Sequence, residues 1–278
     1  MNIRKSKLFN CIAVATLAFG FAFTAVAAEP AAVAKPMPGQ ITRKDGTKIS
    51  GNIRWMSQGR KYIVSQSNKD GRSISTDVPL SDVARVETRK PEKLEAAIRA
   101  VETGKGAAAI PVLAQIVKQY EMLGWDEPAT RYLAQATLDS GKADVAVAIC
   151  EKIIKVKPEA AYLGDVAPIY WQALLATNKK AKLTELIGKA IATGDRYASA
   201  SALIMRGDMF MEQKEPMNAL KDGYLRVVVL YENVRAVQPE ALFKAAKAFE
   251  ALSQNNNAEK FRSTLRSKFP KSSYAKQL

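Results

Sequence analysis

The hydrophobic positions of this chain repeat with two different periods, and the change falls near residue 90. Between residues 40 and 90, short runs alternate apolar and polar positions, separated by turn dipeptides such as Asp45-Gly46 and Gln58-Gly59. This period of two predicts β-strands with one buried face. After residue 90, amphipathic stretches of roughly 12–17 residues follow one another with short Gly, Asn, Lys or Pro breaks, a pattern that predicts helices.

The first of these regions, residues 40–90, is expected to contain five short strands. Ile49, Ile53 and Trp55 share one face of a strand, and Gly51 between them indicates a bend or bulge. Five strands in about 50 residues are too short for a two-sheet sandwich of usual size. We therefore expect a strongly bent sheet that closes on itself as a small five-stranded β-barrel.

The second region, residues 91–270, is expected to form about ten helices paired into about five hairpins. Pro91 suits the first turn of the first helix, and Glu92 suits the positive end of its dipole. Residues 271–278 follow as a tail. The predicted fold class is thus mostly α, an α-solenoid preceded by a small β-barrel.

Three of the hairpins align as a 34-residue unit, starting at Glu127, Ala200 and Pro239. Small residues at positions 8 and 20 would let two helices approach, a bulky residue at position 11 would fill the gap, and proline at position 32 would end the second helix. The residues concerned are Gly207 and Ala246 at position 8, Phe210 and Phe249 at position 11, Ala146, Ala219 and Ala258 at position 20, and Pro158 and Pro270 at position 32.

These positions resemble the tetratricopeptide repeat, a family of stacked helical hairpins that bind other proteins. The chain departs from the family at position 4, where Thr130, Leu203 and Leu242 replace its tryptophan. The stretches near residues 90–126 and 163–199 match only in helix length, turn position and apolar spacing. Successive units start roughly 36–39 residues apart, which is longer than the ideal repeat.

The resemblance implies that the first helix of each pair lines a concave groove that binds peptides or helices of other proteins. Trp171 and Phe243 are the expected anchors, because aromatic side chains dominate interface energetics; packing in the core is the alternative for both. The other groove residues that the resemblance implies are Arg131, Gln135, Ile204, Asp208 and Lys247.

The β region resembles Sm-like small β-barrels in residues 44–53 (KDGTKISGNI) and 78–83 (VPLSDV). Those barrels often bind RNA inside cells. The cations of this region lie near Trp55 and Tyr62, a combination that suits stacking on RNA bases and contact with RNA phosphates. The alternative is that these cations only form a solvated charged face. The expected basic surface consists of Arg54, Arg60, Lys61 and Arg72.

Residues 1–28 have the pattern of a Sec-type signal peptide. A basic start containing Arg4, Lys5 and Lys7 precedes an apolar stretch that ends in Ala-Val-Ala-Ala at Ala28. An uncleaved membrane anchor is the alternative, because residues 8–26 are nearly long enough to span a bilayer. Residues 29–39, with three prolines, are expected to form a flexible leader.

Export determines which partners we expect. The mature chain would be soluble in the periplasm or another extracytoplasmic space, where a protein of the cell envelope is the expected partner and nucleic acid is not. The alternative is an anionic cell-wall polymer or lipid surface bound through the basic β-barrel. The formal net charge is +15, and residues 35–93 hold 13 Lys and Arg against 6 Asp and Glu.

Composition argues against catalysis. The chain has no histidine, which excludes Ser-His-Asp and Cys-His mechanisms and removes the commonest metal ligand. Of its two cysteines, Cys11 lies in the N-terminal apolar stretch, so Cys150 would be alone in the mature chain. We expect Cys150 to be a buried, inert thiol, with cross-linking to a partner as the alternative. No cofactor, metal site or enzymatic activity is expected; the expected function is that of an exported scaffold or adaptor.

Overall fold

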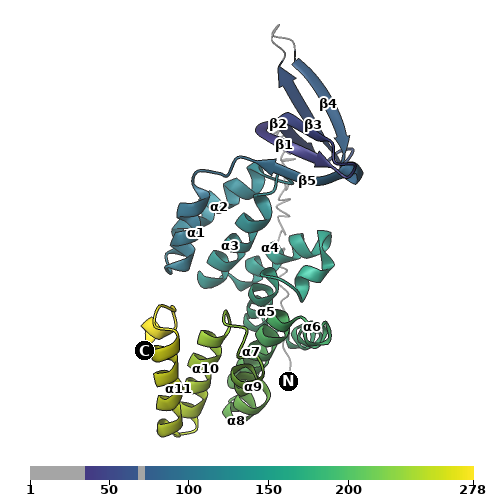
Figure 1. The fold of residues 1–278 in the computed structure, drawn as a ribbon. Coiled ribbons are helices and arrows are strands. Elements are labelled where there is room, and N and C mark those ends of the chain that lie inside the picture. The colour runs from purple at the N-terminus through teal and green to yellow at the C-terminus, as the bar shows by residue number, and fades with distance from the viewer. Residues whose placement is uncertain (1–34, 68–72) are drawn as a thin grey trace, which may run out of the picture. The chain divides into compact units, whose positions relative to one another are not determined.

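A computed structural model describes residues 35–67 and 73–278 (Figure 1). The predicted signal peptide, most of the predicted leader and Arg72 lie outside these residues. The described residues form one compact unit, in which the sheet comes first along the chain and the helices follow. Within the described part, none of the helices combines the length and the hydropathy needed to cross a membrane.

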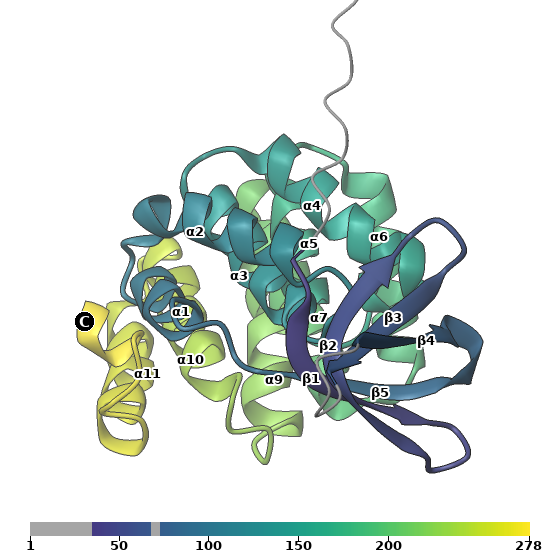
Figure 2. The same cartoon turned by 90° about the horizontal axis from the view of Figure 1, so that it is seen from above.

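Five antiparallel strands form one sheet in the order β4-β3-β2-β1-β5 (Figure 2). The strands are β1 (Met37–Arg43), β2 (Lys48–Met56), β3 (Lys61–Ser67), β4 (Ser73–Pro79) and β5 (Val83–Thr88), and the 3₁₀ turn η1 (Leu80–Asp82) joins the last two. β1 begins at Met37, inside the predicted leader. The single bulge of the described register lies between Thr42 and Arg43, not at Gly51. Gly51 instead allows close strand contact, because a Cβ there would lie 2.7 Å from the Ser65 carbonyl oxygen.

The sheet is open, so the prediction of a closed barrel was wrong. Its edge strands β4 and β5 pair with β3 and β1 and not with each other. The apolar face, which includes Ile41, Ile53 and Val64, is covered by Leu123, with Tyr120 and Met122 packed beside it. Because residues from the helical part cover this face, the sheet buries it without closing on itself.

Three hydrogen bonds join the sheet to residues 122–125. The Tyr62 hydroxyl donates to the Met122 carbonyl at 2.9 Å, the Thr88 hydroxyl donates to the Leu123 carbonyl at 2.9 Å, and the Trp125 indole N–H donates to the Thr88 carbonyl at 2.9 Å. Burial, with a contribution from Asp126, raises the pKa of Tyr62 to about 12. The phenol therefore stays protonated and able to donate this hydrogen bond at neutral pH.

The helices pair in chain order into five hairpins (Figure 1). Residues 216–230 form one continuous helix with a π-helical turn in its middle, and we call it the π-bulged helix. Counted in this way, the described residues contain ten α-helices, as the sequence predicts. Their bounds are α1 (Leu94–Glu102) with α2 (Gly106–Gln119), α3 (Asp126–Asp139) with α4 (Ala143–Val156), α5 (Val166–Ala176) with α6 (Lys180–Ala192), α7 (Arg196–Glu212) with α8 (Pro216–Ala219), η3 (Leu220–Tyr224) and α9 (Leu225–Leu230), and α10 (Gln238–Ala251) with α11 (Asn255–Lys268).

All five hairpins turn with the same backbone geometry. A residue with positive φ follows each first helix, and the next N–H donates to the carbonyl five residues earlier, which is a Schellman-type helix end. The positive-φ residues are Gly104, Gly141, Asn178, Lys214 and Ser253. They are spaced 37, 37, 36 and 39 residues apart. The repeat therefore includes the two hairpins that matched the 34-residue unit only weakly.

The hairpins stack on one another, because both helices of each hairpin contact the first helix of the next hairpin. The three largest apolar clusters cross hairpin boundaries, so no hairpin buries its apolar face alone. The predicted small positions are confirmed as buried: Ala146, Ala219 and Ala258 are fully buried, and Gly207 and Ala246 are buried. Pro158 and Pro270 each follow the end of a second helix by two residues.

Candidate protein-binding surfaces

The predicted groove anchors do not lie on an accessible groove. The Trp171 side chain is fully buried, and its indole N–H donates to the Ala161 carbonyl at 2.9 Å. Ile204 is also buried, in the cluster shared by α7, the π-bulged helix and α10. Both residues stabilise the core, so their assignment to a binding surface was wrong. The physical reason is that α5 and α7 are covered on nearly every side.

Phe243 is covered by the chain that follows α11. Its ring lies 5.5 Å from that of Tyr274 and 4.5 Å from the Lys247 ammonium, and it packs beside Leu265. The predicted tail thus packs onto α10 and ends in the short 3₁₀ helix η4 (Ala275–Gln277). Phe243 is therefore not free to anchor a partner in this structure, although Lys247 is exposed.

Asp208 belongs to an ion-pair network between α7 and α10. It accepts hydrogen bonds from the Tyr224 hydroxyl at 2.7 Å and from the Lys244 ammonium at 2.6 Å, and Lys244 also contacts Glu240 at 2.6 Å. Burial alone would lower the pKa of Lys244. The negative charges of Glu240 and Asp208 have the larger effect, so the pKa of Lys244 is raised. The network joins the last two hairpins, so Asp208 has a structural role here that its position in the repeat did not indicate.

Arg131 and Gln135 remain partly accessible on α3. Arg131 forms an ion pair with Asp165 at 2.9 Å and lies 4.9 Å from the Tyr132 ring, and Gln135 donates to Asp139 at 2.7 Å. The structure therefore does not bring the predicted groove residues together as one open surface.

The predicted basic surface of the sheet is partly neutralised. Lys61 forms an ion pair with Asp77 at 2.5 Å, while Arg54 lies on β2 and Arg60 in the turn before β3. Tyr62 is buried, and its ring packs 4.9 Å from that of Trp55. Tyr62 is thus not available to stack on a base.

Cys150 is confirmed as a buried free thiol. Burial, assisted by the neighbouring charge of Glu151, raises its pKa to about 12. A thiol that stays protonated at neutral pH is a poor nucleophile and a poor metal ligand. The described residues also contain no group of three or more Cys, Asp or Glu side chains placed to hold a metal ion.

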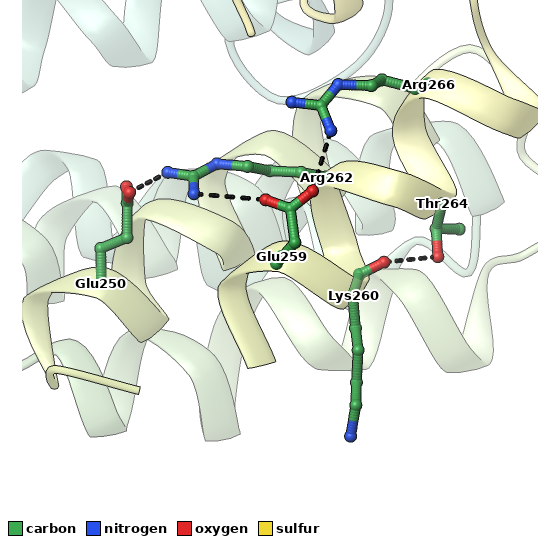
Figure 3. A network of polar contacts seen from close by, with 6 residues as sticks. All are labelled: Glu250, Glu259, Lys260, Arg262, Thr264 and Arg266. Atoms are coloured by element: carbon green, nitrogen blue, oxygen red, sulfur yellow. Dashed lines mark hydrogen bonds and ion pairs between the residues drawn. The ribbon is translucent and has the colours of Figure 1, made fainter. Parts of the chain in front are cut away.

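A second ion-pair network lies on the last hairpin and links α10 to α11 (Figure 3). Arg262 of α11 pairs with Glu250 of α10 and with Glu259 at 3.7 Å, and Arg266 pairs with Glu259 at 2.8 Å. These side chains line a pocket of about 300 Å³ together with Gln277 and Leu278. Partly exposed pairs of this kind contribute little stability each, and their charges satisfy one another.

The sequence predictions missed the π-bulged helix as a surface. Seven large apolar side chains are exposed in the described part of the chain, and three of them lie on this helix: Met217 at 54%, Val229 at 71% and Leu230 at 60%. The sequence feature that could have indicated this surface is the apolar run Leu225-Arg-Val-Val-Val-Leu230. In the structure only Val227 of this run is buried. A helical turn that is apolar on every side normally lies against other protein on every side.

Val229 and Leu230 form an apolar ridge between two pockets. A pocket of about 490 Å³ lies on one side and is lined by Met217, Leu225 and Phe249 among others. A pocket of about 840 Å³ lies on the other side, where Leu242 and Phe269 contribute apolar surface. We call the two pockets and this ridge the ridge surface.

Comparisons with known proteins found similar chains among solved structures. No protein-family model matches the chain, and no curated protein matches it. Among solved structures, a thermophilic TPR protein of Thermus thermophilus is 14% identical over 66% of this chain and 93% of its own, with a TM-score of 0.48. A putative kinesin light chain of Podosopora anserina, with nearly identical TPR-like repeats, is 15% identical over 63% of this chain and 92% of its own, with a TM-score of 0.44.

Proposed function

We propose that the protein is a non-catalytic scaffold that binds another protein through its helical hairpins. The observation that supports this most directly is the ridge surface. Stacked hairpins have no need to leave apolar side chains in water, and exposed apolar patches next to pockets are typical of protein interaction sites. The surface lies on hairpins four and five, not along the inner positions of the first helices.

The proposal includes a location in the cell envelope. Its support is the basic and then apolar pattern of residues 1–28, followed by small residues at Ala25, Ala27 and Ala28. Fractionation of cells that produce the full chain tests it. Recovery of a shortened chain from the periplasmic or secreted fraction is expected, and recovery of the full-length chain from the cytoplasm would contradict export.

The alternative, binding of an anionic polymer or lipid through the sheet, has weaker support. Lys61 is neutralised by Asp77, and Arg85 is paired with Glu87 at 2.8 Å. Sedimentation with cell wall or anionic vesicles tests this alternative directly, because binding through charge would weaken as salt is raised.

Two matched substitutions test the scaffold function. Val229 is 71% exposed on the ridge surface, and Val156 is 69% exposed at the end of α4. An aspartate at either position faces water, so both variants are expected to fold like the wild type. The wild-type chain and Val156→Asp should retain the same envelope protein from extract, and Val229→Asp should lose it. Equal retention by all three chains, or retention of no protein by any, would refute the proposal.

A further inference from the structure

The ridge surface also carries information about the chemistry of its partner. Valine is a poor helix former, yet three consecutive valines lie in the last turn of the π-bulged helix, at residues 227–229. Val227 is fully buried and accounts for one face of this turn, whereas Val229 and Leu230 extend into solvent. Neither helix propensity nor the core of this chain explains the last two side chains, which differ from the equally exposed Val156 in lying together beside two pockets, as at a contact with another molecule.

Three carbonyls at this helix end are already paired with side chains of the same chain. The Leu230 carbonyl accepts a hydrogen bond from Arg196 at 2.9 Å, and the carbonyls of Val227 and Tyr231 accept from the buried Gln238 amide at 2.9 Å each. Strand addition does not fit this site, because it needs the exposed edge of a sheet and residues 225–230 are helical. The site is a ridge of side chains between two pockets. A surface of this shape can pack against another helix, whose side-chain rows fit into the pockets on either side of the ridge.

The charged side chains around the ridge are mainly cationic. Five cationic side chains and one acidic side chain, Glu232, line the two pockets; the cations are Lys221, Arg226, Arg196, Arg235 and Lys268. Glu232 pairs with Lys268 at 3.5 Å, and Asp222 pairs with Arg226 at 3.2 Å. Neither Lys221 nor Arg235 forms an ion pair with any residue of the described ranges.

We propose that the ridge surface binds an amphipathic helix of a partner protein whose apolar face is bordered by Asp and Glu. Apolar side chains of that helix would fill the pockets beside Val229 and Leu230, and its carboxylates would meet the unpaired cations Lys221 and Arg235. Charges of this kind at the rim of an interface select the partner and speed its association. This inference deepens the proposed scaffold function and depends on it.

Photo-crosslinking tests the inference in the full chain. A photo-reactive amino acid at Val229 is activated in cells, and the crosslinked segment is identified by mass spectrometry, with the same probe at Val156 as the control. The expected adduct is specific to Val229 and joins it to a segment with apolar residues at helical spacing and flanking Asp or Glu. A peptide of that segment should bind the wild-type chain, and raising the salt concentration should weaken the binding.

Charge reversal separates this inference from the proposed function. Arg235→Glu should weaken binding of that peptide about tenfold, which equals the loss of about 1.4 kcal/mol. Lys260→Glu, on α11 and outside both pockets, should leave binding unchanged. An adduct at Val229 with a basic or neutral segment, a lipid or a second copy of this chain would overturn the inference and leave a binding surface in place. Absence of any adduct at Val229 would contradict both.

Discussion

At the scale of single residues, the hairpin turns show where the sequence is not optimal for the backbone it adopts. Lys214 holds a φ of 62° and Ser253 a φ of 60°, in the same turn position where the first two hairpins have glycine. Side chains other than glycine are strained in this left-handed conformation. These positions are therefore a direct test of the repeated turn.

Lys214→Gly is expected to stabilise the protein by about 0.5–1 kcal/mol, because glycine adopts the left-handed conformation without steric cost. Thermal unfolding of the full chain measures this as a higher Tm. Lys260→Gly, in the interior of α11, is the control and should destabilise by about 1 kcal/mol. A lower Tm for Lys214→Gly would mean that the turn differs from the one described.

Cys150 gives a second prediction at this scale. Its pKa is raised to about 12 by burial, whereas an unfolded thiol loses its proton near pH 8.5. The folded state thus keeps a proton that the unfolded state releases. The resulting stabilisation is complete below the unfolded pKa and is lost as pH rises towards 12. At pH 8, iodoacetamide should modify Cys150 in urea and not in the native chain, as judged by peptide mass spectrometry; equal modification would show an accessible thiol.

At the scale of elements, the π-bulged helix is positioned by two glycines. A Cβ on Gly223 would lie 2.7 Å from the Gly207 Cα, and one on Gly207 would lie 2.4 Å from the Tyr224 ring. Gly207 was predicted from the repeat as a small position, but Gly223 was not. The π-turn at Leu220–Tyr224 adds a residue to the helix, and a register of this kind is not visible in a 3.6-residue pattern.

Gly223→Ala is expected to cost about 1–3 kcal/mol, because the added methyl group would push the π-bulged helix away from α7. Gly188→Ala provides the matched control, since that helical glycine has open space around its Cβ position and alanine should stabilise α6 by up to about 1 kcal/mol. Denaturant unfolding of both variants measures the difference. Equal effects would show that α7 and the π-bulged helix do not meet at these glycines.

The helices and strands themselves could be predicted because their apolar periods are local. The exposure of particular side chains could not. Trp171 and Ile204 have the repeat positions of groove residues, yet both are buried, because α5 and α7 are covered on almost all sides. The sequence of α5 could have predicted this burial, because apolar residues lie on every face of the helix between Val166 and Leu174.

At the scale of the whole molecule, the open sheet depends on contacts that are remote in sequence. Tyr62 and Thr88 bind the carbonyls of Met122 and Leu123, and neither pairing has a local signal. Without knowledge of that contact, closure into a barrel was the only way for five short strands to bury their apolar face. The ridge surface could not be predicted for the same reason, because its side chains come from elements between α7 and α11 that are remote in sequence.

Hydroxyl-radical footprinting with and without the captured partner tests most directly whether the ridge surface binds a protein. Met217 and Leu230 are more than half exposed on the ridge surface, and Val156 is comparably exposed elsewhere. Saturation with the partner is predicted to lower the oxidation of Met217 and Leu230 several-fold and to leave Val156 unchanged. Unchanged oxidation of Met217 and Leu230, with protection on α3 or on the sheet, would contradict binding at the ridge surface.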